Sequence, residues 1–371
     1  MRLFTIITAT SALLAGGMFV LAPAVAAEAP RTAHHITRPA DSTPAAGEGW
    51  RVVLSGRRTL GAFADVGAVS PTDAWITRTG LPLLRWNGQA WGPDPNPPAE
   101  GAVPYLVRAT GAGDEWQFLE STSSVDVRHW NGITWTRRAI NVEGAHATDA
   151  AIAGDETWVS GLRLGAAGMT DVLWRWDGAK WRTVEPPRPV STLAAVSEKD
   201  VWALSSPGER NLGYDGERLP AAMHWDGRRW SVVPLPVLAP DEGTHAELND
   251  LAVLDRDRVY AVGTVTSYDE AGRVNRQGLV LRWDGRVWTR LPHRTTGVAY
   301  IQAVSDGRGG LWLAEEGSVG LTHLSAAGRW LRVTLPLPKG GEVRALANVP
   351  GTTKMWATVQ SGGRQLVLSY G

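Results

Sequence analysis

Residues 84–91 read Leu-Arg-Trp-Asn-Gly-Gln-Ala-Trp, and this stretch decides the fold because the chain repeats its pattern. With Leu83 included in front, the pattern is an apolar residue, any residue, Arg or His, Trp, Asp or Asn, Gly, two further residues and Trp. It recurs around Trp130, Trp176, Trp225 and Trp283, with a weaker sixth copy over residues 324–330. Aromatic and aliphatic residues flank a polar pair, so each copy predicts a β-hairpin. For Asn-Gly and Asp-Gly we expect a two-residue type I′ turn.

A second hairpin is predicted before each of these. It begins with small apolar residues, continues through a short polar turn and ends in a strand that carries an aromatic residue. The seven copies run from Ala68 to Trp75, Ala109 to Trp116, Ala151 to Trp158, Ala195 to Trp202, Ala252 to Tyr260, Ala303 to Trp312 and Ala345 to Trp356. Two hairpins make four strands, and seven units over residues 47–371 give about 46 residues each, which is typical of a propeller blade.

The two ends of the chain complement each other. The seventh repeat reaches residues 368–371 without its last strand, and Gly47 and Trp50 carry the Gly-x-x-Trp spacing that is missing there. We therefore predict an all-β fold, a seven-bladed β-propeller over residues 47–371 that is closed by pairing of the N-terminal strand with the C-terminal blade. Closure of this kind removes the open sheet edges of a linear array.

The repeat also supports a resemblance. The pairing of Ala-Val-Ser-x-x-Asp-Val-Trp-Ala (residues 195–203) with His-Trp-Asp-Gly-x-x-Trp (residues 224–230) resembles secreted β-propeller repeat proteins of actinobacteria. The resemblance covers nearly all of the mature chain, residues 27–371, and implies a propeller fold and an extracellular location, but no activity and no functional residues. The Gly-x-x-Trp turn is also similar to the Asp-box of sialidase-type propellers, although it lacks the Ser of that box.

The N-terminal segment is typical of a secreted protein. Residues 1–26 read as a signal peptide, because Arg2 precedes an apolar run and residues 24–26 form an Ala-Val-Ala cleavage site. The alternative is a membrane anchor, which the Thr, Ser and Gly residues of the run disfavour. Residues 27–46 are rich in Ala, Pro and Thr and are expected to form a flexible spacer. We expect a secreted, extracellular protein with no membrane span after cleavage.

Composition narrows the classes of function. The chain contains no cysteine, which excludes disulfides, cysteine metal sites and a cysteine nucleophile. Its formal net charge is zero, whereas a nucleic-acid-binding protein is expected to carry a basic excess. The 19 tryptophans are assigned to packing between blades, because 18 of them occupy three repeated columns. We expect a monomer that binds no nucleic acid.

The sequence predicts no metal site and no cofactor. Three histidines, His129, His224 and His323, occupy the repeat position held by Arg in other copies. The other histidines of the propeller lie in different repeats and do not have zinc-binding spacing. The chain has neither the Gly-x-Ser-x-Gly motif of a nucleophilic serine nor a phosphate-binding loop. The sequence leaves open a pair of carboxylates for glycoside hydrolysis, because such a pair is defined by its distance in space and not by its spacing along the chain.

Departures from the repeat give a first candidate binding region. The segments between the second and third strands lengthen in blades 3, 4 and 5, over residues 160–171, 205–220 and 264–277, and all of them are expected on one face. The candidate ligand-binding residues there are Arg210, Tyr214, Asp215, Tyr268, Asp269 and Arg273. Loops on a rigid scaffold often carry binding residues. The alternative is sequence drift, since lengthening a surface loop costs little stability.

A second candidate region lies at the entrances to the innermost strands. Polar residues that are not repeated from blade to blade are expected near the mouth of the central channel. They are Arg108, His146, Asp149, His245, Asp250, Gln302 and Arg344. The alternative is that they are ordinary solvated polar residues.

These observations favour a secreted, non-catalytic binding protein that recognises an extracellular glycan or cell-wall polymer on the loop-rich face. One alternative is a secreted glycoside hydrolase or polysaccharide lyase with its site at the channel mouth. Another is a scaffold that binds an extracellular protein. The sequence alone does not choose among them, because one fold hosts many functions.

Overall fold

The structure is a computed structural model that describes residues 49–57, 61–119, 121, 124–166, 168–205, 219–239, 244–292, 296–337 and 340–371. Every described residue belongs to one compact unit, Pro44–Gly371. The predicted signal peptide and spacer therefore lie outside the described residues. No described residue belongs to a helix that could cross a membrane.

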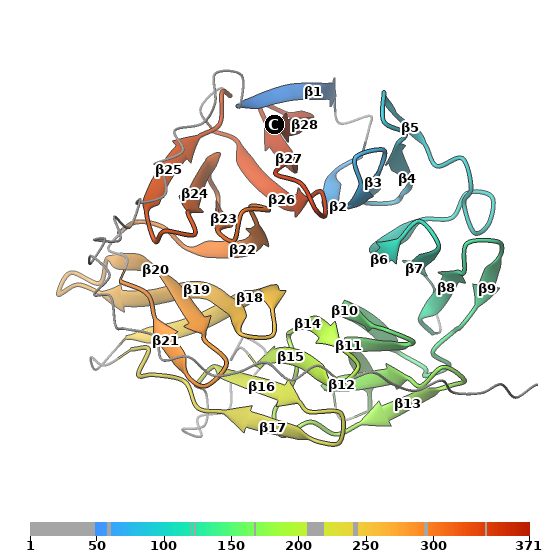
Figure 1. Cartoon of the computed structure of the whole chain (residues 1–371), viewed down its shortest axis with the longest axis horizontal. Helices are drawn as coiled ribbons and strands as arrows, with labels where there is room; N and C mark the ends of the chain where they lie inside the picture. Colours follow the sequence, from blue (N-terminus) through green and yellow to red (C-terminus); the bar gives the residue numbers. More distant parts are fainter. Residues whose placement is uncertain are drawn as a thin grey trace, which may run out of the picture. The chain divides into compact units, whose positions relative to one another are not determined.

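Regular secondary structure in the described residues is entirely β, in seven four-stranded antiparallel sheets (Figure 1). Blade 1 contains β2 (Phe63–Ser70), β3 (Asp73–Arg78), β4 (Leu81–Trp86) and β5 (Trp91–Pro93). Blade 2 contains β6 (Pro104–Gly111), β7 (Asp114–Leu119), β8 (Asp126–Trp130) and β9 (Trp135–Arg137). Blade 3 contains β10 (Ala145–Ala153), β11 (Glu156–Gly165), β12 (Gly168–Trp176) and β13 (Trp181–Val184).

The remaining four blades follow in chain order. Blade 4 contains β14 (Thr192–Ser197), β15 (Asp200–Ser205), β16 (Ala221–Trp225) and β17 (Trp230–Val233). Blade 5 contains β18 (His245–Asp255), β19 (Arg258–Tyr268), β20 (Val274–Trp283) and β21 (Trp288–Arg290). Blade 6 contains β22 (Tyr300–Ser305), β23 (Leu311–Glu315), β24 (Gly320–Leu324) and β25 (Trp330–Thr334). Blade 7 contains β26 (Glu342–Asn348), β27 (Met355–Ser361), β28 (Arg364–Tyr370) and β1 (Trp50–Arg57).

The seven blades form a closed ring. Their innermost strands contact one another in the cyclic order β2, β6, β10, β14, β18, β22, β26 and back to β2. The N-terminal strand β1 pairs with β28 from Trp50↔Tyr370 to Arg57↔Arg364 and completes blade 7. The predicted seven-bladed propeller and its mode of closure are therefore confirmed. Gly47, which belongs to the predicted closing pattern, lies outside the described residues.

Tryptophans fill most junctions between blades. Trp202 of blade 4 is 1% exposed and contacts two rings of blade 5. Its ring centroid lies 5.1 Å from that of Trp283 and 5.3 Å from that of Trp288, whose plane is at 90° to its own. Edge-to-face contacts of this kind favour the aromatic quadrupoles. We call this arrangement, in which one indole is held between two aromatic rings of the next blade, a tryptophan clamp. The other clamped rings are Trp116, Trp158, Trp312 and Trp356.

The turn between the third and fourth strands differs from the expected two-residue type I′ turn. Trp86 pairs directly with Trp91, so four residues connect the strands. Asn87 Oδ1 accepts hydrogen bonds from the N–H groups two and three residues further on, both at 2.9 Å, and Gly88 has a φ of 92°. The corresponding residues Asn131, Asp177, Asp226 and Asp284 make the same bonds. The turn is longer than predicted because the Asp or Asn side chain caps it.

The lengthened segments of blades 3 and 5 are extended hairpins rather than loops. β11 and β12 remain paired as far as Gly165↔Gly168, and β19 and β20 as far as Tyr268↔Val274. His245, at the start of β18, pairs with Thr266 within the blade 5 extension. Both hairpins therefore rise on the face where the innermost strands begin. Residues 206–218, which hold most of the expected blade 4 segment, lie outside the described residues.

Candidate functional site

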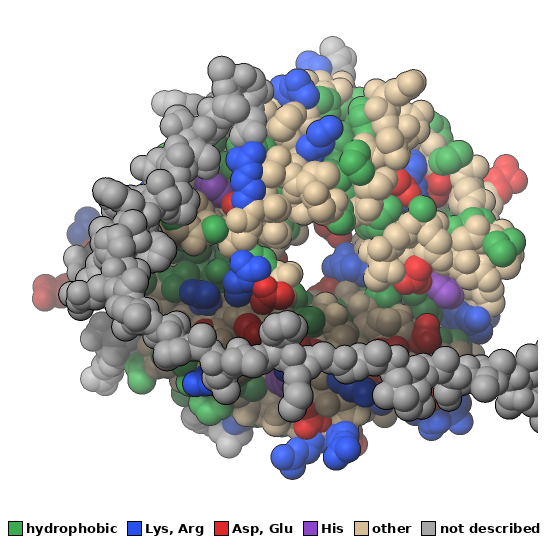
Figure 2. Space-filling model, viewed as in Figure 1, with side chains coloured by type: hydrophobic (Ala, Val, Ile, Leu, Met, Phe, Trp, Pro, Cys, Tyr) green, Lys and Arg blue, Asp and Glu red, His purple; other side chains and the backbone are tan. Residues whose placement is uncertain are grey.

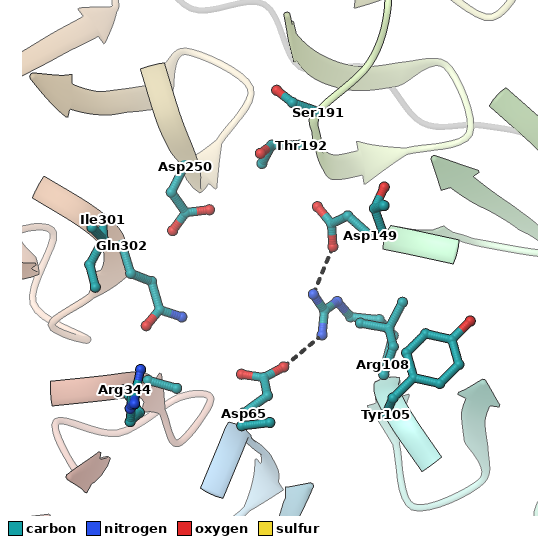
Figure 3. Close-up of a pocket in the computed structure, with 14 residues that line it drawn as sticks. Asp65, Tyr105, Arg108, Asp149, Ser191, Thr192, Asp250, Ile301, Gln302 and Arg344 are labelled. Carbon is teal, nitrogen blue, oxygen red and sulfur yellow. Dashed lines mark hydrogen bonds and ion pairs between the residues drawn. The ribbon is translucent and has the colours of Figure 1, made fainter. Parts of the chain in front are cut away.

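A bulge near the start of the innermost strand orients one polar side chain in each of four blades. The strand pairing skips one residue before Asp65, Asp149, Asp250 and Gln302. A bulge changes the direction of the following side chain, and here that side chain points toward the central channel (Figure 3). Figure 2 shows the opening at the centre of the ring, with basic and acidic side chains at its rim.

These side chains line a pocket of about 350 Å³ at the channel mouth. Five of the seven residues predicted for this region line it, namely Arg108, Asp149, Asp250, Gln302 and Arg344. The pocket is also lined by Asp65, Tyr105 and Thr192, which the sequence had not singled out. The only signal for them is their position at the start of an innermost strand, equivalent to that of the predicted residues.

Arg108 joins three blades at the wall of this pocket. Its Nη1 lies 3.0 Å from Oδ2 of Asp65 in blade 1, and its Nη2 lies 2.7 Å from Oδ1 of Asp149 in blade 3 (Figure 3). Its Nε donates to the carbonyl oxygen of Ala150 at 3.0 Å. Burial alone would lower the pKa of Arg108, but Asp149 and Asp65 outweigh that effect and raise it. The guanidinium is therefore charged at any accessible pH.

Other lining side chains bind the backbone of the next blade. Asp149 Oδ2 accepts a hydrogen bond from the N–H of Leu193 in blade 4 at 2.9 Å. Asp250 Oδ2 accepts one from the N–H of Ala303 in blade 6, also at 2.9 Å. Gln302 spans the next junction in the same way, with a bond of 2.7 Å to a backbone N–H of blade 7. We call these contacts interblade latches. They hold the pocket wall rigid and use part of its hydrogen-bonding capacity.

Asp250 differs from the other carboxylates of the pocket because it forms no ion pair with a described residue. Burial raises the pKa of Asp250 to about 7, and the negative charge of Asp149 adds to this effect. The N–H groups of Ala303 and Leu251 and the charge of Arg108 oppose the rise only in part. Asp250 therefore exchanges its proton near neutral pH.

This raised pKa predicts a pH-dependent stability. Between the unfolded pKa of Asp, about 3.9, and the folded value, the unfolded chain releases a proton that the folded chain retains. The Asp250 contribution to the free energy of unfolding should therefore fall by about 1.4 kcal/mol per pH unit between these values. We expect Asp250→Asn to gain about 2–4 kcal/mol relative to the wild type between pH 4.5 and 7.5. Urea unfolding across this range measures the difference, and parallel curves would contradict the assignment.

The two predicted histidines of this region do not line the pocket. The ring of His146 stacks on Tyr105, a lining residue, with 4.6 Å between ring centroids and 19° between planes. His245 is exposed, and its ring centroid lies 6.5 Å from that of Tyr268 in the blade 5 hairpin. Neither histidine therefore joins Asp149 and Asp250 in the pocket wall.

The predicted hairpin residues of blade 5 surround a short turn. Tyr268 is 57% exposed, and Arg273 Nε lies 2.7 Å from Oδ2 of Asp269 within the turn. This ion pair is solvent-exposed and orders the turn more than it stabilises the fold. The predicted blade 4 residues Arg210, Tyr214 and Asp215 lie outside the described residues.

The repeated histidines are part of the blade architecture. His129, His224 and His323 each hydrogen-bond an Asp of their own blade at 2.8–2.9 Å. Each ring also packs against the Trp of its own second strand. Within the described ranges, no group of three His, Asp or Glu side chains is arranged to hold a metal ion.

Comparisons with known proteins support the fold and no more. The chain matches no family model and no curated protein in sequence. Among solved structures it is similar to YCF48 bound to D1 peptide, with a TM-score of 0.54 and 14% identity over 86% of this chain and 96% of that one. It is also similar to a catalytically inactive virginiamycin B lyase from Staphylococcus aureus with quinupristin. The TM-score is 0.54 and the identity 12%, over 86% of this chain and 99% of that one. For the Neurospora crassa Pan2 WD40 domain the TM-score is 0.56 and the identity 11%, over 86% of this chain and 95% of that one. This chain therefore shares the propeller fold with proteins of diverse function.

Proposed function

We propose that this protein is a secreted, non-catalytic binding protein that holds a glycan or cell-wall polymer at the mouth of its channel. The observation that carries the proposal is the pocket of about 350 Å³ whose wall alternates hydrogen-bond acceptors and donors. Hydroxyl groups both donate and accept. A polyhydroxylated ligand therefore matches a wall that offers Asp250, Thr192 and Arg344 together.

Two further features support a binding role on this face. The interblade latches fix the polar groups before any ligand arrives, and a pre-ordered site loses less entropy on binding. The extended hairpins of blades 3 and 5 stand on the same face as the pocket. Tyr268 presents an exposed ring there, on which the apolar face of a sugar can stack. A polymer that enters the pocket can extend along these hairpins.

One observation favours hydrolysis as a second candidate. Asp250, with a pKa of about 7, can hold a proton near neutral pH, while Asp149 in the same pocket is ion-paired with Arg108. Glycoside hydrolases use such a pair of carboxyl groups as acid and as nucleophile or base. Binding remains our first proposal because both oxygens of Asp149 are already engaged, Oδ1 with Arg108 and Oδ2 with Leu193.

A glycan and cell-wall fragment array, probed with residues 27–371, tests both candidates. We expect Arg344→Ala to weaken binding at least tenfold, because this residue lines the pocket and is not an interblade latch. Arg258→Ala is the matched control, because the Arg258 side chain is 43% exposed, as that of Arg344 is, pairs with Asp255 of its own blade and lies outside the pocket lining. Mass spectrometry of the recovered ligand should find it intact. Cleaved ligand would favour the hydrolase, and absence of binding, or equal effects of the two variants, would contradict a glycan site at the channel mouth.

A further inference from the structure

The junction between blades 1 and 2 lacks the tryptophan clamp found at five other junctions. Trp130 and Trp135 of blade 2 lie 5.6 Å apart, as the two outer rings of a clamp do. Trp75 of blade 1, which occupies the clamped column of the repeat, makes no described ring contact with either of them. It is 4% exposed and packs instead with Leu83 and Val107 near the innermost strands. The outer ring pair of blade 2 therefore holds no aromatic ring of the preceding blade, although Nε1 of Trp135 donates to the carbonyl oxygen of Asn96 at 3.0 Å.

Gly67 explains why Trp75 lies elsewhere. Gly67 pairs with Trp75 across β2 and β3, and a Cβ atom at Gly67 would lie 2.2 Å from Cζ2 of the indole. No side chain fits in that distance, so only glycine allows the indole to lie over the innermost strand. The residues that pair with the clamped Trp158, Trp202 and Trp356 are Ala151, Ala194 and Ala347.

A cleft of about 620 Å³ lies at this junction. Trp130 and Trp135 form part of its wall, and charged groups of both blades form another part. Glu115, which is 6% exposed, replaces the apolar residues Val201 and Val259 of other blades. The charged lining residues are Asp73, Asp94, Glu115 and Arg85. Three carboxylates against one guanidinium give the cleft a formal charge of −2.

Asp94 supplies a hydrogen-bond acceptor that no described residue uses. Its side chain is 5% exposed, and its Oδ1 accepts from the N–H of Asn96 at 3.1 Å and lies 3.8 Å from Nε of Arg85. Its Oδ2 is buried and has no hydrogen-bond partner among the described residues. A buried carboxylate oxygen without a donor is costly. Because Asp94 lines the cleft, a donor on a bound ligand can satisfy this oxygen.

We propose that the cleft between blades 1 and 2 binds a small aromatic cation, a flat ring that carries an ammonium group. The ring takes the place between Trp130 and Trp135 that an indole fills in the clamped junctions. The ammonium group donates to Oδ2 of Asp94 in a negatively charged surrounding. An aromatic anion would meet three carboxylates, and an aliphatic amine would leave the two rings unfilled. This site is separate from the channel mouth, and the proposal does not depend on the function proposed there.

Three probes separate the contribution of the aromatic ring from that of the ammonium group. Tryptamine has the ring and the ammonium group, indole-3-propionate has the ring with a carboxylate, and butylamine has the ammonium group alone. Calorimetric titration of the intact protein should find that tryptamine binds at least tenfold more tightly than either of the other two. Equal affinity for indole-3-propionate, or no binding of tryptamine, would overturn the proposal.

Two variants locate the site. In Gly67→Ala the new Cβ forces the indole of Trp75 off the innermost strand and toward the empty clamp, so tryptamine affinity should fall at least tenfold while the circular dichroism spectrum is unchanged. Gly111→Ala is the matched control, because a Cβ there meets nothing within 4 Å. Asp94→Asn should lower tryptamine affinity at least tenfold, and it keeps the test valid if Gly67→Ala does not fold. Wild-type affinity in both Gly67→Ala and Asp94→Asn would refute the assignment.

Discussion

Removal of β1 is expected to destabilise the propeller by about 5 kcal/mol or more and to cause aggregation. This strand contributes a ladder of hydrogen bonds with β28, each worth about 1 kcal/mol. It also contributes Trp50, whose ring contacts Trp312 at 5.8 Å and Tyr370 at 5.5 Å. Without β1, the edge of β28 is free to pair with another chain. The expected loss equals a large part of the stability of a typical protein, about 5–15 kcal/mol.

Urea unfolding and light scattering test this expectation by comparing a chain that begins at Gly61, and so lacks β1, with one that begins at Gly49 and keeps it. Trp50→Ala keeps the strand but removes the indole, and its expected cost is smaller, about 2–3 kcal/mol, because Trp50 is only half-buried. An added peptide of residues 49–57 should restore part of the lost stability in the shortened chain. If the shortened chain unfolds at the same urea concentration and stays monodisperse, ring closure contributes little to stability.

The fold was predictable because its determinants are repeated. Five blades repeat the same spacing of Trp and Gly, and a repeated spacing is a stronger signal than the sequence of any single strand. Closure was predictable from Trp50, which restores the ring pair that the last blade lacks. The turn geometry was not predictable from Asp-Gly or Asn-Gly alone. Those dipeptides suit a type I′ turn, whereas here the side chain of Asn87 caps a four-residue connection.

The channel-mouth pocket was only partly predictable. Asp149, Asp250 and Gln302 stood out because these polar residues differ from blade to blade, and they do line one pocket. The bulges that orient them and the latches to the next blade depend on pairing between strands far apart in sequence. Asp65 could not be predicted for the same reason. Its contact with Arg108 joins residues that are 43 positions apart in the sequence.

The cleft between blades 1 and 2 was hidden by the repeat itself. Trp75, Trp130 and Trp135 all occupy their expected columns, so the sequence assigns them to packing. The change that opens the clamp is the absence of a methyl group at Gly67. The repeat holds this signal, since Gly67 stands where four other blades have Ala and Glu115 stands where two have Val, but the consequence depends on the orientation of the indole.

Arg85→Met should destabilise the protein by about 3–5 kcal/mol at neutral pH, because it leaves the Glu115 carboxylate buried without its partner. Nη2 of Arg85 lies 2.9 Å from Oε1 and 2.8 Å from Oε2 of Glu115, across the junction of blades 1 and 2. Burial raises the pKa of Glu115 even with Arg85 beside it. Removal of the guanidinium also leaves Asp94 as a neighbouring negative charge, so the pKa of Glu115 should rise further in the variant.

The pH dependence separates a lost charge pair from lost packing. A carboxyl group whose folded pKa is raised stabilises the folded state at low pH and loses that contribution as pH rises through the folded pKa. The cost of Arg85→Met should therefore shrink toward pH 4, and the double variant with Glu115→Gln should remove most of it. Arg282→Met is the matched control, because Arg282 holds the same repeat position in blade 5 and forms no ion pair with a described residue. A cost equal to that of Arg282→Met at every pH would mean that packing of the side chain, and not its charge, holds this junction together.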